Sequence, residues 1–331
     1  MPVDPARARP KRFPPPEFPP RRLPPFARMP PAVFPVVLGV LGMALAVKRA
    51  LVEAGLPQGL GDMALGVAVG LWLFCAVAYG MKIARRPAVV SEELRVLPGR
   101  AGLAAASVGG LAVAAALGFF LPGLARGVLA LGLLLQAALA VLMLRALLAA
   151  PPEGRVVTPV WHLAFVGFIV GALAAVPLGW ETLARGILWA TMPVAAGIWA
   201  VSLWQLWKTV PPAPLRPLLA IHLAPASLFA SVAGLLGMTW LAQGMVVLGC
   251  AIAVALLASG RWIAEAGFSP LWGAFTFPMA AFGSALLING WAMGGVLVTV
   301  LALGAVPAIA WRVIRMWPDG SLAAKTNAAT A

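Results

Sequence analysis

The chain has little charge and few of the residue types that carry catalysis. Its 331 residues include 10 Asp and Glu, 24 Lys and Arg, two His, two Cys and one Tyr. Charged residues amount to 10% of the chain, whereas a soluble domain has about a quarter. A water-soluble globular fold is therefore excluded.

The groups that membrane enzymes and pumps use are also missing. Near the centres of the long apolar stretches there is no acidic residue and no Arg or Lys, although such groups usually mark intramembrane chemistry. Two His cannot form an all-His metal cluster, and there is no Walker-type Gly-Lys motif for ATP. Cys75 and Cys250 fall in apolar stretches, where a thiol acts as a small hydrophobe. We predict no catalytic residue, no metal and no cofactor, and hence no enzyme.

What the chain does have is apolar sequence: 62% of its residues are hydrophobic and the mean hydropathy is +0.96. About 20 helical residues cross the roughly 30 Å hydrocarbon core. Backbone groups facing lipid must be paired within their own segment, which favours helices here. The sequence predicts an all-α integral membrane protein with ten transmembrane helices. The predicted spans are 32–51, 60–82, 100–121, 125–148, 158–178, 183–207, 215–236, 239–258, 271–288 and 293–315.

The net charge of +14 follows the predicted topology. If the N-terminus is cytoplasmic, all but four of the basic residues fall in cytoplasmic segments, as the positive-inside rule requires. The four exceptions are Lys48, Arg49, Arg126 and Arg185. We therefore expect a multi-pass protein with both termini in the cytoplasm, in contact with membrane lipid and not with nucleic acid.

The ends of the chain differ from its middle. Residues 1–31 hold 12 prolines and seven basic side chains without an apolar stretch typical of a signal peptide. We predict a disordered cytoplasmic arm that is attracted to anionic lipid, with an SH3-type ligand as the alternative. Residues 32–316 form the predicted channel domain, and 317–331 a flexible cytoplasmic tail.

The odd-numbered spans recur at near-regular intervals. They begin near residues 32, 100, 158, 215 and 271, at intervals of 68, 58, 57 and 56 residues. Such a repeat predicts five helical hairpins in a quasi-fivefold arrangement around a central pore. Prolines suggest which helices are inside, because a helix bent by proline exposes a carbonyl that must avoid lipid.

Pro35, Pro225 and Pro278 fall in odd spans, whereas the even spans 60–82, 125–148 and 239–258 lack internal proline and the sixth span has Pro193 as an exception. We predict that the odd helices form an inner ring with pore-lining kinks and that the even helices face lipid. The alternative is that prolines are simply frequent in membrane helices.

Neutral small groups remain to line a pore. Hydroxyls and helix dipoles can solvate an anion weakly, as fast conduction requires. Each hydroxyl could instead bond its own helix or a neighbouring one, and each His could be either structural or pH-sensitive. The predicted lining residues are Ser107, Thr158, His222, Ser227, Ser231, Thr276 and Ser284, with Asn289 and His162 as further candidates.

Two aromatic rings flank the proline of the ninth span, Phe275 and Phe277. A single ring can close a narrow apolar pore because a hydrophobic constriction excludes water. The spacing alone equally allows both rings to be packing between helices.

Three segments resemble a known family. They are Pro31–Gly42 in the first span, Arg216–Ser227 entering the seventh, and Leu271–Met279 in the ninth. In this order they are similar to the tellurite-resistance and dicarboxylate transporter family, which includes bacterial TehA-like proteins, fungal malate permeases and plant slow anion channels. The likeness covers about residues 32–316.

This resemblance implies a homotrimer in the bacterial cytoplasmic (inner) membrane, with one pore in each subunit formed by five inner helices. It also implies a gating phenylalanine on the ninth helix, for which Phe277 fits best and Phe275 second. Relatives pass monovalent anions, dicarboxylates or oxyanions through a neutral pore.

Three functions follow as hypotheses. The first is a passive channel for small anions, gated by Phe277. The second is a secondary transporter that exports a C4-dicarboxylate, sulfite or tellurite, with proton coupling through His222. The third is a scaffold or a subunit of a lipid enzyme, without a conduit.

Overall fold

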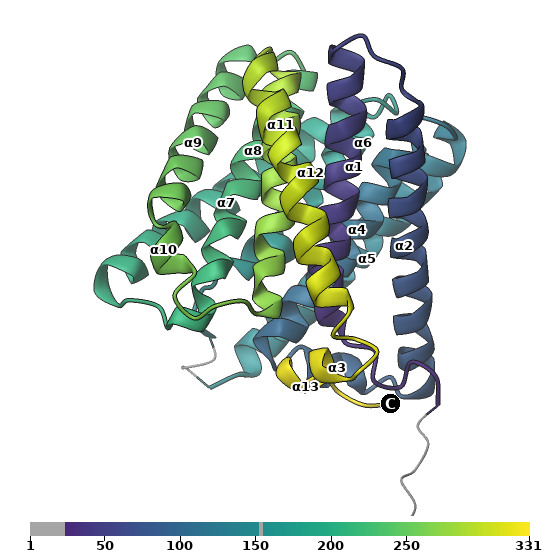
Figure 1. Ribbon diagram of the computed structural model, residues 1–331, viewed down its shortest axis with the longest axis vertical. Helices are drawn as coiled ribbons and strands as arrows, with labels where there is room; N and C mark the ends of the chain where they lie inside the picture. The colour runs from purple at the N-terminus through teal and green to yellow at the C-terminus, as the bar shows by residue number, and fades with distance from the viewer. Residues whose placement is uncertain (1–23, 152–154) are drawn as a thin grey trace, which may run out of the picture.

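The computed structural model describes residues 24–151 and 155–331, and within them it consists of helices without strands (Figure 1). Nine helical segments of the described chain are long and apolar enough to cross a membrane. Their α-helices are α1 (Phe34–Glu53), α2 (Gly59–Arg85), α4 (Leu97–Leu117), α5 (Pro122–Ala149), α7 (Glu181–Lys208), α8 (Leu223–Leu235), α9 (Thr239–Ala258), α11 (Thr276–Ile288) and α12 (Ala292–Ile314).

The predicted fifth span differs from the other nine. In place of one helix over 158–178, the structure has a π-helical turn, η4 (His162–Val166), followed by α6 (Phe168–Ala175). The combined segment, His162–Ala175, is shorter than the other spans. The expected count of ten full-length helices is therefore not confirmed, because the described residues hold nine long segments and this short one.

The helices run alternately up and down. Two short helices, α3 (Val89–Glu93) and α13 (Ser321–Lys325), lie together with the C-terminus at one end of the bundle. We call this end the base and the opposite end the top. All five odd spans start at the base and end at the top, and α10 (Gly260–Ile263) follows α9 on its return toward the base.

The odd spans form a closed inner ring. Going round, α1 packs against α4, α4 against α6, α6 against α8, α8 against α11, and α11 again against α1. Over an apolar window of 18 residues in each span, 72–78% of the residues are buried in the four long inner spans and 17–28% in the outer spans. The predicted arrangement of odd helices inside and even helices outside is confirmed by this burial.

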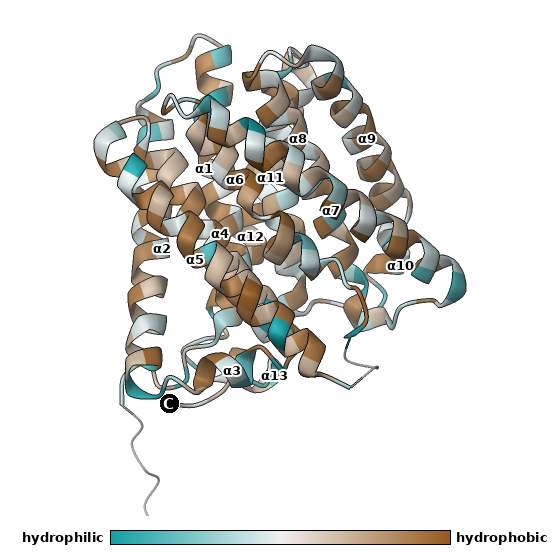
Figure 2. Cartoon of the chain, turned by 180° about the vertical axis from the view of Figure 1, so that it is seen from behind, coloured by the Kyte–Doolittle hydropathy of each residue, from teal (hydrophilic) through white to brown (hydrophobic). Residues whose placement is uncertain are grey.

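Small residues in α4 allow neighbouring segments of the chain to approach it closely. In α4 the Cα atoms of Gly102 and Gly109 lie against Pro31 and Trp72, leaving no room for a side chain. The outer helices instead carry large apolar side chains that point away from the bundle, such as Leu134 of α5 and Trp240 of α9. Figure 2 shows hydrophobic residues along these helices, with most of the strongly hydrophilic ones near the two ends. This surface suits a lipid environment.

The C-terminal tail, for which the sequence predicts flexibility over 317–331, packs against the base of the bundle. It forms α13, whose Leu322 is fully buried. The backbone N–H of Ala329 donates to Glu93 Oε1 at 3.0 Å, and that of Ala331 donates to the carbonyl of Ala27 at 2.9 Å. Apolar burial and these hydrogen bonds offset the entropy of ordering the tail.

The same region holds the end of the predicted N-terminal arm. Residues 1–23 of that arm lie outside the described residues, but Ala27 and Met29 are buried against the bundle. Lys82 Nζ donates to the carbonyl of Met29 and to Glu93 Oε1, each at 2.8 Å. The side chains of Lys82 and Glu93 are both fully buried. This ion pair joins both ends of the described chain to the base of the bundle.

Candidate functional site

Phe277 lies inside the inner ring, between two cavities. The base cavity is bounded by Pro35, Ala101, Leu163, Ile221 and Phe277, with at least one residue from every inner span. The top cavity is bounded by Phe277 together with residues of all five inner helices: Gly42, Leu45, Arg49, Ala112, Val170, Leu173, Leu228, Ser231, Ala281 and Ser284. The ring therefore borders two spaces, each of which is lined by residues of all five inner spans.

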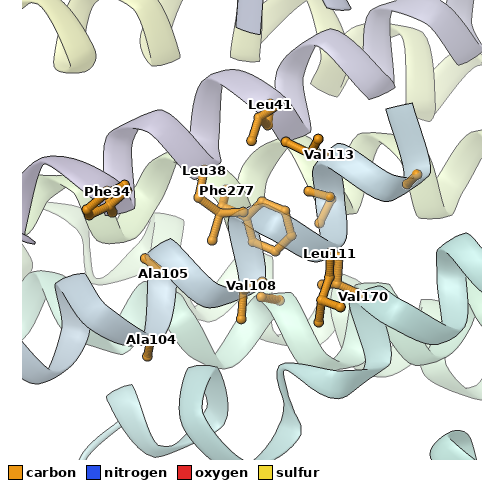
Figure 3. Packing of buried hydrophobic residues seen from close by; sticks show 14 of the residues in the cluster. Phe34, Leu38, Leu41, Ala104, Ala105, Val108, Leu111, Val113, Val170 and Phe277 are labelled. Carbon is orange, nitrogen blue, oxygen red and sulfur yellow. The ribbon is translucent and has the colours of Figure 1, made fainter. Parts of the chain in front are cut away.

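The start of α11 fixes the position of this ring. Phe277 is the second residue of the helix, and 6% of its surface is exposed. Its neighbour Thr276 donates to the carbonyls of Gly273 at 2.7 Å and Pro35 at 3.2 Å, which holds α11 against α1. A Cβ atom on Gly42 would lie 2.8 Å from Phe277 Cδ2, so α1 leaves room for the ring. Figure 3 shows the ring among buried apolar side chains that include Leu38, Val108 and Leu111.

The three predicted proline kinks have a different structural basis from the one expected. Pro35, Pro225 and Pro278 lie within the first three residues of α1, α8 and α11, not in helix interiors. A first-turn N–H has no partner within its α-helix, so proline there removes none of the α-helical bonds. Each is preceded by a 3-10 helix: η2 (Pro31–Val33), η5 (Ala213–His222) and η6 (Pro270–Phe275). At each of these three prolines a 3-10 helix gives way to an α-helix, whereas the sequence predicted a bend within a single helix. Pro35 and Pro278 border the base cavity, and Pro225 borders the side cavity described next.

A third space, the side cavity, extends from Phe277 toward the π-turn. Its lining includes Val108, His162, Val166 and Pro225. The π-turn changes the pairing of backbone carbonyls, and the fully buried Gln136 of α5 donates to two of them, those of Leu163 at 3.0 Å and Ala164 at 2.8 Å. The sequence interpretation did not consider Gln136. Its signal was a lone amide near the middle of the span 125–148, where Arg126 and Arg145 lie closer to the ends.

The two histidines meet at the edge of this cavity. His162 Nε2 lies 3.0 Å from His222 Nδ1, and the rings are T-shaped with centroids 5.1 Å apart. Trp199 of α7 packs on His162 and donates to the carbonyl of His222 at 3.3 Å. The other nitrogens, His162 Nδ1 and His222 Nε2, are buried without a partner among the described residues. Sequence reasoning named both residues but did not pair them.

The predicted polar lining divides into three groups. Ser231 and Ser284 face the top cavity. Thr158 and His222 border a lateral groove near the base, which Trp204, Thr209 and Leu218 also line. The remaining candidates, Ser107, Ser227, Thr276 and Asn289, do not line any of the three cavities that contact Phe277.

The remaining hydroxyls differ in their partners: Thr276 donates to the carbonyls of Gly273 and Pro35, whereas Ser107 has no partner among the described residues. Ser227 donates to the carbonyl of Leu223 at 2.8 Å, a bond within the helix, and Asn289 joins α11 to the carbonyl of Ala230 on α8. Phe275 packs edge-to-face against Trp272 with ring centroids 5.6 Å apart, and it borders none of the three cavities. The two phenylalanines therefore differ in their surroundings: Phe277 borders the three cavities, and Phe275 does not.

One charged residue at the top cavity was missed. Arg49 follows Leu38, Gly42 and Leu45 at intervals of four, three and four residues, which is one face of a helix. Leu38 borders the base cavity, and the other three border the top cavity. The spacing in the sequence could have identified Arg49 as facing the inside of the helix ring, because Arg49 shares a helix face with Gly42 and Leu45 of an inner span.

Comparison with protein families gives the broader assignment. Residues 28–316 match the model of the SLAC1 family, described as voltage-dependent anion channel. The match covers most of the chain. The chain belongs to the SLAC1 family. No curated protein matches it at a significant level.

Membership of the SLAC1 family agrees with the resemblance noted in the sequence. The family consists of anion channels and transporters and not of enzymes, so this member is a multi-pass membrane protein of that class. The structure adds that Phe277 borders both the base cavity and the top cavity, and it shows which polar residues line the top cavity.

Proposed function

We propose that the chain is a passive anion channel whose axial path is closed by Phe277. The observation that supports this most directly is the position of the ring between the base and top cavities, each bounded by all five inner spans. The surroundings of the ring are apolar, and a narrow apolar constriction excludes water and ions. Movement of one side chain would then join the two cavities.

The test compares two phenylalanines. Phe277→Ala should raise the anion conductance of proteoliposomes or oocytes strongly, because it removes the obstruction. Phe275→Ala is the matched control, since that ring packs on Trp272 outside the cavities and its loss should leave the current near wild type. Equal currents from wild type and Phe277→Ala, at equal expression, would contradict the gate. Vesicles that stay impermeable even with both rings truncated would favour a scaffold without a conduit.

We further infer how the channel domain, residues 32–316, sits in the membrane. The base carries Lys82, Arg85 and Arg86, which suits a cytoplasmic position under the positive-inside rule. Both termini would then be cytoplasmic. The membrane would be the inner membrane of a bacterium and the assembly a homotrimer with one pore per subunit. Cross-linking of the protein in native membranes, followed by mass determination, tests the trimer.

The permeant species are proposed to be small anions or oxyanions. Reversal potentials of the Phe277→Ala variant in chloride, nitrate, malate, sulfite and tellurite would rank them. A reversal potential that follows the cation gradient would contradict an anion pathway.

A second candidate function is a proton-coupled exporter of a C4-dicarboxylate, sulfite or tellurite. The observation that favours it is the His162–His222 contact, which lies between the side cavity at Phe277 and the lateral groove near the base. Imidazoles in contact can exchange a proton. Saturable uptake driven by a pH gradient, and lost in His222→Gln, would support coupling. Linear, voltage-driven flux that is the same in His222→Gln would support the channel.

A further inference from the structure

Four basic side chains lie at the top of the bundle, and three of them have partners there. Lys48 Nζ is 2.6 Å from both Gln58 Oε1 and Asp62 Oδ1. Arg126 donates to the carbonyl of Leu178 at 3.1 Å, and Arg185 approaches that of Leu236 at 3.5 Å. These contacts tie loops and helix ends together, so three of the exceptions to the positive-inside pattern have a structural explanation.

Arg49 is the fourth, and it differs from the others. No hydrogen bond or ion pair joins its side chain to any residue within 24–151 or 155–331, and its Nε atom is buried without a partner. The side chain borders the top cavity, where its neighbours include Leu45, Leu173 and Leu228. A guanidinium that is partly removed from water and left without a counter-charge is costly. An anion in the cavity would remove that cost.

The polar groups of the cavity complement such an anion. Ser231 already donates its hydroxyl hydrogen to the carbonyl of Ser227 at 2.9 Å. Ser284 also borders the cavity, and its hydroxyl makes no hydrogen bond to a described residue, so it is available to donate. The cavity therefore contains a guanidinium with parallel N–H donors and one further O–H donor, with no carboxylate in its lining.

We propose that Arg49 and Ser284 form a binding site for a small oxyanion on the top side of Phe277. The planar guanidinium can donate two parallel hydrogen bonds to two oxygens of one oxyanion, whereas a spherical halide cannot use this geometry equally well. Nitrate should therefore bind more tightly than chloride. The site rests on the proposed function in that it places the anion on the same axial path, but binding itself requires no opening of Phe277.

The test measures binding on the purified full-length protein in lipid nanodiscs. Nitrate, with gluconate added to hold ionic strength constant, should raise the thermal unfolding temperature of the wild type more than chloride does. Arg49→Gln should weaken nitrate binding by about tenfold or more, the range expected for losing a charge-assisted hydrogen bond. Arg49→Lys retains the charge but lacks the parallel N–H donors of the guanidinium, so this variant should still bind anions but lose the preference for nitrate. Ser284→Ala should weaken binding by a smaller factor.

The matched control is Arg126→Gln, which removes the same charge from the same end of the bundle but from a side chain that bonds Leu178. It should leave nitrate binding unchanged. Equal losses in Arg49→Gln and Arg126→Gln would show a general charge effect and overturn the site, as would nitrate affinity that is unchanged in Arg49→Gln. If Arg49→Gln does not fold, Arg49→Lys and Ser284→Ala decide the question by the nitrate-to-chloride ratio.

The proposed anion site at Arg49 and the proposed gate at Phe277 can be rejected independently of each other. Nitrate binding lost in Arg49→Gln, with no current gained in Phe277→Ala, would retain the site and reject the gate. Current gained in Phe277→Ala, with wild-type nitrate affinity in Arg49→Gln, would retain the gate and reject the site.

Discussion

The inner ring is built differently on the two sides of Phe277. Toward the base, four of the five inner spans begin with irregular helix: η2, η4, η5 and η6. Toward the top, all five continue as regular α-helix. The base cavity is lined by apolar side chains, whereas the top cavity has Arg49, Ser231 and Ser284.

This difference shows how a membrane bundle can hold an irregular backbone. Regular α-helices satisfy their own carbonyls, so the top half can use its polar side chains to line a cavity. The base half needs side chains from elsewhere to complete its bonding. Gln136 bonds the π-turn, Trp199 bonds the carbonyl of His222, and Thr276 bonds Pro35. The base should therefore be the half more sensitive to loss of a single polar side chain.

The largest loss of stability is expected from breaking the Lys82–Glu93 ion pair at the base. Glu93→Gln leaves the buried ammonium of Lys82 without its carboxylate, which costs about 3–5 kcal/mol when one partner of a buried pair is removed. Chemical unfolding in detergent, followed by circular dichroism, measures the loss. A loss below about 1 kcal/mol, the range of surface pairs, would show that the pair is not what joins the chain ends to the bundle.

Glu92→Gln is the matched control. Glu92 pairs with Arg86 at 2.7 Å, but both side chains are about 40% exposed, so its loss should be much smaller. The hydrogen bonds from Arg86 hold the pKa of Glu92 below its usual value. Its contribution is therefore present at neutral pH and is lost as the pH falls through that lowered pKa. Equal pH dependence of wild type and Glu92→Gln in the acid range would contradict this.

Sequence reasoning predicted the architecture better than the site. Prolines within α-helices were no guide to burial, since Pro193 and Pro307 lie in the outer helices α7 and α12. Hydropathy located the spans, and the hairpin repeat predicted that they alternate between the inside and the outside of the bundle. They could not show that Pro35, Pro225 and Pro278 mark changes of helix type, since 3-10, π and α turns can all contain such sequences. The contact between His162 and His222 depends on the rotation of two helices about their axes, which a repeat interval does not define. The burial of Leu322 in the C-terminal segment could not be predicted either, because it depends on packing against the bundle that the local sequence does not define.

A smaller loss of stability is expected when the side-chain hydrogen bonds to the π-turn are removed. Gln136→Leu keeps the size of the side chain but leaves the carbonyls of Leu163 and Ala164 without their donor, at a cost of about 1–3 kcal/mol. Gln205→Leu is the control, because the Gln205 side chain makes no hydrogen bond to a described residue. Thermal unfolding of both variants in the same detergent gives the comparison. Equal stability of the two would mean that the π-turn does not depend on side-chain bonding.

The smallest effect, and the one that tests the boundary between the two halves, is expected at Gly42. The Cβ atom in Gly42→Ala would lie 2.8 Å from Phe277 Cδ2, so the ring must shift toward one of the cavities, at a cost of about 1 kcal/mol. Gly66→Ala on α2 is the control: a Cβ there meets nothing within 4 Å, so the exchange should add up to about 1 kcal/mol of stability. Gly42→Ala should also raise the anion current, although less than Phe277→Ala does, because the ring is displaced but still present. A Gly42→Ala protein that is as stable as Gly66→Ala and carries wild-type current would show that Phe277 already moves freely past α1, and then the ring could not by itself keep the base and top cavities apart.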